Sequence, residues 1–88
     1  MTTFKVSFCN GRDDGEDFTK TYTVTGKFQG LVNHLSSIGT GINEYTECHG
    51  CYYLTGKDID YDMLLENPNL EYIEEHDEHG YIVAEEID

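Results

Sequence analysis

The 88-residue chain has no tryptophan, one proline, one alanine and only five basic residues. Its longest apolar run is far too short for a helix that crosses a bilayer. No charged segment followed by an apolar one opens the chain, as a secretion signal would. We therefore expect a cytoplasmic protein with no membrane segment, in a reducing environment that keeps its three cysteines out of disulfides.

The hydrophobic residues make up 38% of the chain, which is enough for one small core. We expect a single compact domain over residues 1–88. Apolar and polar residues alternate over 3–10 and again over 18–25, with turn residues between them, which predicts an antiparallel hairpin. A helical period follows, with Thr25 as the expected N-cap. The expected buried stripe of this helix is Phe28, Leu31, Val32, Leu35 and Ile38.

The second half of the chain repeats this order. Residues 42–55 predict a hairpin that turns at His49-Gly50, and 57–67 predict a short helix with Ile59, Met63 and Leu64 facing inward. Segments 70–75 and 81–86 predict a last hairpin. The resulting order, ββα-ββα-ββ, predicts an α+β fold: an antiparallel sheet of about six strands with two helices on one face.

Thr-Gly-Lys occurs twice, at 25–27 and at 55–57, each time after an apparent strand. We favour the interpretation that the two segments arrived independently at similar helix-capping residues over that of an internal repeat. Neither copy is a phosphate-binding loop, because the upstream glycine of that motif and its following Ser or Thr are missing.

Two cysteine and histidine pairs have the same spacing. Cys48 and Cys51 flank the predicted turn, and His76 and His79 lie in the next predicted loop. These four residues could supply the ligands of a tetrahedral zinc ion, which would make the chain a zinc-stabilised interaction domain. The glycine that usually follows the second cysteine is absent, and the histidine spacing is shorter than usual. We therefore keep zinc as an alternative and expect no cofactor.

No set of residues in the sequence predicts catalysis. His34, Ser36 and Ser37 share one predicted helix, but this spacing does not direct a hydroxyl toward a base. A redox-active cysteine pair would need to lie at a helix N-terminus, and Cys48 and Cys51 lie in a hairpin. We expect a protein that is not an enzyme.

Charge is the strongest feature of the sequence. Eighteen acidic residues against five basic ones give a net charge of −13. Residues 44–88 carry 14 of the acids and a single base, Lys57. Such a field repels nucleic acid and anionic lipid, attracts basic surfaces, and destabilises the folded chain by self-repulsion. The acids therefore predict a function in binding.

The predicted binding residues follow the second helix and the last hairpin. Asp58, Asp62 and Glu66 are four residues apart and form one acidic stripe on the predicted helix. Carboxylates at such spacing resemble the charges along a nucleic-acid backbone. The full predicted set is Asp58, Asp60, Asp62, Glu66, Glu71, Glu74, Glu75, Asp77, Glu78, Glu85 and Glu86.

In size, charge and compact layout, the chain resembles the small acidic inhibitors of bacteriophages and mobile elements, which include anti-CRISPR and antirestriction proteins that mimic DNA. The resemblance implies a non-enzymatic protein in the host cytosol that blocks a basic nucleic-acid-binding protein or ribonucleoprotein, such as a CRISPR effector or a restriction-type nuclease. It implies contact with that protein and not with nucleic acid or a membrane. A structural or regulatory partner without mimicry is a further alternative.

Overall fold

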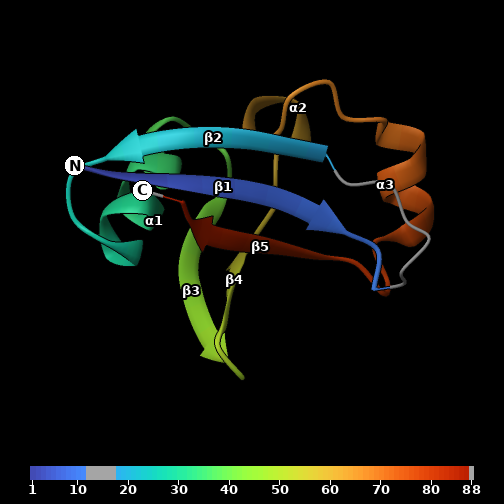
Figure 1. The fold of residues 1–88 in the computed structure, drawn as a ribbon. Helices are drawn as coiled ribbons and strands as arrows, with labels where there is room; N and C mark the ends of the chain where they lie inside the picture. The colour runs from blue at the N-terminus through green and yellow to red at the C-terminus, as the bar shows by residue number, and fades with distance from the viewer. Residues whose placement is uncertain (12–17, 88) are drawn as a thin grey trace.

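The computed structural model describes residues 1–11 and 18–87, which form one antiparallel sheet with helices against it (Figure 1). In chain order the elements are β1 (Thr2–Cys9), β2 (Phe18–Val24), α1 (Phe28–Ser37), β3 (Ile42–Cys48), β4 (Cys51–Gly56), α2 (Tyr61–Leu64), α3 (Leu70–His76) and β5 (Tyr81–Glu86). The predicted α+β class is confirmed. The described residues form five strands and three helices, close to the six and two expected.

The strands lie in the order β2-β1-β5-β4-β3, so the last strand of the chain is the central one. Ile82 of β5 pairs with Phe8 of β1 on one side and with Leu54 of β4 on the other. The two predicted hairpins, β1–β2 and β3–β4, are confirmed. β5 joins them into one sheet (Figure 1).

The predicted strand at 70–75 is wrong, because this segment lies in helix α3. Asn69 caps the helix: its side-chain oxygen accepts a hydrogen bond of 3.1 Å from the backbone N–H of Tyr72. Leu70 and Ile73 are three residues apart, a helical spacing, and Ile73 is buried in the core. β5 therefore pairs with β1 and β4, and the predicted third hairpin does not form.

The predicted helix over 57–67 is shorter than expected and spans only Tyr61–Leu64. Asp58 lies before it with a positive φ of 54°, and Glu66 lies after it. The predicted acidic stripe of Asp58, Asp62 and Glu66 along one helix is therefore wrong. Met63 is 42% exposed rather than inward, whereas Leu64 is buried as expected.

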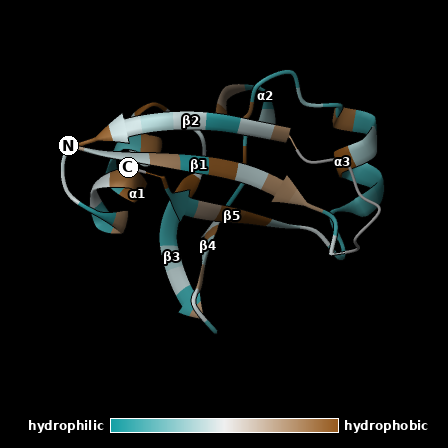
Figure 2. Cartoon of the chain, viewed as in Figure 1, coloured by the Kyte–Doolittle hydropathy of each residue, from teal (hydrophilic) through white to brown (hydrophobic). Residues whose placement is uncertain are grey.

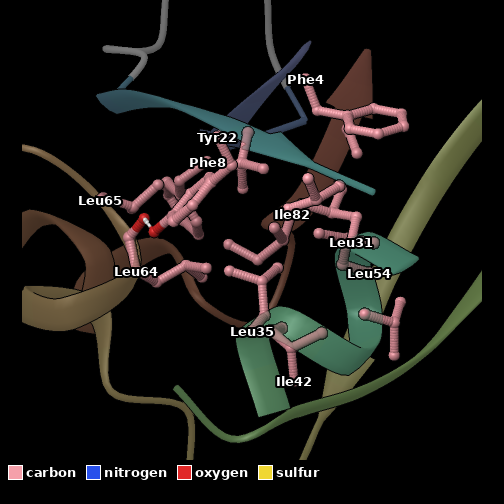
Figure 3. Packing of buried hydrophobic residues seen from close by; sticks show 14 of the residues in the cluster. Phe4, Phe8, Tyr22, Leu31, Leu35, Ile42, Leu54, Leu64, Leu65 and Ile82 are labelled. Atoms are coloured by element: carbon pink, nitrogen blue, oxygen red, sulfur yellow. Dashed lines mark hydrogen bonds between the residues drawn. The ribbon is translucent and has the colours of Figure 1, made fainter. Parts of the chain in front are cut away.

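The core lies between the sheet and the helices (Figure 3). β1 contributes Phe4, Val6 and Phe8, whose alternation places them on one face of the sheet. The other buried apolar residues are Tyr22, Val24, Leu31, Val32, Leu35, Ile42, Leu54, Leu64, Leu65, Ile73, Ile82 and Ala84. Two details of α1 differ from expectation: its N-cap is Lys27 rather than Thr25, and Ile38 is exposed at its C-terminus.

A buried hydrogen bond ties α2 to the second strand. The Tyr22 hydroxyl donates to the Leu64 carbonyl at 2.6 Å (Figure 3). Replacing Tyr22 with phenylalanine would leave this carbonyl without its partner, so we expect a loss of about 1–3 kcal/mol in the free energy of unfolding at pH 7. Tyr45→Phe, at an exposed position of β3, is the control and should be close to neutral.

The same residue predicts a pH dependence. Burial raises the pKa of Tyr22 from 10.0 to about 12. The unfolded chain therefore loses this proton at a lower pH than the folded protein does. The stabilising contribution is complete below pH 10 and is lost as the pH rises through 12. Urea titrations from pH 9 to pH 12 should show a smaller loss of stability in Tyr22→Phe than in the wild type, and parallel losses would contradict the assignment.

Candidate protein-binding surface

Most of the predicted binding residues lie on two short helices and the segments next to them. We call these nine side chains the acidic region: Asp58, Asp60, Asp62, Glu66, Glu71, Glu74, Glu75, Asp77 and Glu78. All nine are exposed, and residues 58–78 contain no lysine or arginine. None of the nine forms an ion pair with a described residue. Figure 2 shows much of α3 as hydrophilic, in agreement with this distribution.

Local hydrogen bonds fix the backbone that carries the acidic region. Asp60 is the N-cap of α2, and its Oδ1 accepts from the N–H of Met63 at 3.2 Å. The backbone N–H of Asp60 in turn donates to the buried Thr40 carbonyl at 2.8 Å. Asn69 caps α3, and Ile73 anchors that helix in the core. The carboxylates therefore project from a fixed backbone, which lowers the entropic cost of binding.

Five members of the acidic region surround one hollow of about 510 Å³. Asp58, Asp60 and Asp62 border it from the segment that leads into α2, and Glu74 and Asp77 border it from α3. Its remaining lining is apolar or aromatic and consists of Ile59, Tyr61, Leu70 and Ile73. The hollow thus combines an anionic rim with a carbon-rich floor.

Two of these lining residues interact electrostatically. Partial burial, and secondly the negative charge of Asp77, raise the pKa of the Tyr61 phenol. Like an ordinary tyrosine, Tyr61 is protonated at neutral pH, and its phenol can donate a hydrogen bond. The sequence reading missed the contribution of Leu70 and Ile73 to this floor, because it assigned them to a strand. Their spacing of three residues after the Asn69 cap is the signal that could have found them.

The structure separates Glu85 and Glu86 from the acidic region. They lie at the end of β5, at the opposite end of the sheet from α3 (Figure 1). Lys27 donates to Glu86 at 2.7 Å, and Lys5 lies 3.9 Å from Glu85. Because both carboxylates face a cation, they contribute little negative field, and we leave them out of the candidate surface.

The structure also separates the two pairs of residues predicted as a zinc alternative. Cys48 and Cys51 face each other at the β3–β4 turn, where His49 and Gly50 have positive φ, as the predicted two-residue turn requires. Both thiols are free and exposed. His76 ends α3, and His79 follows it. Among residues 1–11 and 18–87, no three His, Cys, Asp or Glu side chains group closely enough to hold a metal ion.

We expect the protein to fold without zinc. Protein purified without added metal should contain no stoichiometric zinc by elemental analysis, and reducing agent should leave its Tm unchanged, because the thiols carry no disulfide. The double variant Cys48→Ser/Cys51→Ser, at an exposed turn, should change the free energy of unfolding by no more than about 0.5 kcal/mol. One zinc per chain, lost on Cys51→Ser or on His79→Ala, would instead establish the metal site.

Comparison with protein-family models, with curated proteins and with solved structures found no match. No helix in the described part of the chain is long and apolar enough to span a bilayer. The geometry of the α+β fold and of the acidic region is therefore the basis for a functional assignment.

Proposed function

We propose that this protein is a non-enzymatic inhibitor that binds the basic nucleic-acid-binding surface of another protein through its acidic region. The observation that carries the proposal is the concentration of nine exposed carboxylates in residues 58–78, without a basic residue among them. Lysines and arginines that normally hold phosphates would hold these carboxylates instead, which blocks access of nucleic acid.

The distribution of charge over the molecule supports a directed contact rather than a uniform solubilising charge. Of the four described lysines, Lys5 and Lys27 pair with glutamates of β5. Lys20 lies on β2, with its Nζ 3.5 Å from the Met63 carbonyl, and Lys57 directly precedes the acidic region. No lysine lies on α3, and none of the four forms an ion pair with the acidic region. A molecule with this asymmetry is steered so that its acidic end approaches a basic partner first.

The targets we propose are a CRISPR effector or a restriction-type nuclease in the cytosol of a bacterial host. The carboxylates come from two short helices and their flanking segments, and not from a regular stripe. The proposed mimicry is therefore one of charge density over a rigid patch, and does not reproduce the repeating geometry of a phosphate backbone.

The test is competition for one partner identified by co-purification from cells that carry candidate nucleases. Binding should weaken steeply between 50 and 500 mM salt, and duplex DNA or guide RNA should displace the protein in a fluorescence anisotropy assay. Salt-independent binding, or a ternary complex with nucleic acid still bound, would reject mimicry and favour a regulatory partner that uses an apolar interface.

A further inference from the structure

The hollow between the 58–62 segment and α3 is more than a patch of negative charge. Leu70, an apolar residue of its floor, is 46% exposed, and Ile59 and Tyr61, which also line it, are half-buried. A solvated acidic face would not need an apolar floor. An occupant that fits this hollow carries both carbon surface and positive charge.

Long cationic side chains have this combination. Lysine and arginine place a chain of methylene groups against apolar surface while their charged ends reach polar groups. The apolar floor of the hollow suits the methylene stem, and the carboxylates of Asp62, Glu74 and Asp77 suit the charged end.

The arrangement of the rim favours arginine over lysine. Its carboxylates come from two separate segments, so they approach an occupant from two sides. A planar guanidinium has five N–H donors in a fixed fork and can bond two carboxylates at once, whereas an ammonium group is compact and more strongly hydrated. The ring of Tyr61, which also lines the hollow, offers an aromatic surface to a guanidinium.

We propose that this hollow receives one arginine side chain of the basic partner and forms the central contact of the interface. The proposal rests on the proposed function for the identity of the partner. The chemistry of the hollow can be tested without any partner.

The probe is Nα-acetyl-arginine amide, titrated into the full-length protein at low salt and followed by the methyl NMR signals of Ile59, Leu70 and Ile73. We expect saturable shifts of these methyl groups and a Kd at least threefold lower than that of Nα-acetyl-lysine amide. Nα-acetyl-citrulline amide, which has nearly the same shape and no charge, should produce no saturable shift.

Two variants separate the rim from the floor. Asp62→Asn/Asp77→Asn should weaken binding of the arginine probe at least fivefold, whereas Glu44→Gln/Glu47→Gln, with the same change in net charge on β3, should not. Leu70→Ser keeps every carboxylate and should weaken binding at least threefold, because the methylene stem loses its floor. Their NMR spectra report whether each variant is folded.

Equal affinity for the arginine and lysine probes, shifts spread over the whole acidic region, or no effect of Leu70→Ser would overturn the proposal. The arginine site and the proposed mimicry can fail independently of each other. If the probe binds but nucleic acid does not compete for the partner, the arginine site stands and mimicry fails. If nucleic acid competes but the probe leaves these methyl groups unshifted, mimicry stands and the arginine site fails.

Discussion

Gly56→Ala is expected to destabilise the protein strongly. A Cβ atom added to Gly56 would overlap the backbone carbonyl oxygen of Gly41 and lie 2.8 Å from the Cα of Ile42. These are backbone atoms of β3 and of the turn before it, so no rotamer change can relieve the overlap. Overpacking costs about 1–3 kcal/mol and occasionally more, and the overlap with backbone atoms places this substitution at the upper end. That cost is a large share of a total stability of about 4–13 kcal/mol for a chain of this length.

Gly50→Ala is the matched control for this substitution. Gly50 lies at the β3–β4 turn, with φ of 82° and no atom within 4 Å of an added Cβ. Alanine at this position should lower the free energy of unfolding by about 1–2 kcal/mol, because only the left-handed conformation is unfavourable. Circular dichroism and thermal unfolding of the two variants should therefore differ strongly. Similar Tm values for both would contradict the close packing of β4 against Gly41.

The second large effect concerns binding to the partner. The double charge reversal Asp62→Lys/Glu74→Lys changes the net charge by +4, from −13 to −9. Both residues border the hollow. We expect at least a hundredfold increase in Kd, because each new lysine both removes an attraction and repels a basic partner.

Glu44→Lys/Glu47→Lys changes the net charge by the same amount on β3, outside the acidic region. It should raise Kd by less than tenfold, through weaker long-range steering alone. Surface plasmon resonance at two salt concentrations measures both effects. Equal losses from the two double variants would mean that total charge, and not the acidic region, determines binding.

The Thr-Gly-Lys pair shows what local sequence can and cannot predict. The copy at 25–27 follows β2 and the copy at 55–57 overlaps the end of β4, and their glycines serve different purposes. Gly26 has a φ of 91° and reverses the chain before α1, whereas Gly56 has no such backbone and is needed for close approach to Gly41. Neither threonine caps a helix, because the N-caps of α1 and α2 are Lys27 and Asp60, so the predicted shared capping role is wrong.

The α+β class and two hairpins followed from periodicity, because alternation and helical spacing are local properties of the chain. The position of β5 could not follow from them, since pairing with both β1 and β4 is decided by long-range packing of Ile82. The error at 70–75 has a similar cause. Leu70 and Tyr72 alternate as in a strand, but the Asn69 cap and the burial of Ile73 favour the helix.

The candidate surface was predicted in its composition but not in its shape. Charge counting found the nine carboxylates of the acidic region, because exposure of unpaired acids is nearly certain in a small domain. It also included Glu85 and Glu86, whose lysine partners are distant in sequence. The hollow was not predictable, because it depends on how α3 packs beside the 58–62 segment.

The central position of β5 also has a consequence for how the chain folds during its synthesis. Among the described strands, only β5 connects the β1–β2 hairpin to the β3–β4 hairpin, so the two hairpins stay separate until residues 81–86 leave the ribosome. Isolated two-stranded hairpins are only marginally stable. The nascent chain would keep Phe8 and Leu54 without their common neighbour Ile82. Folding should then occur in one late, cooperative step that closes contacts distant in sequence, which makes it slow for a protein of this size.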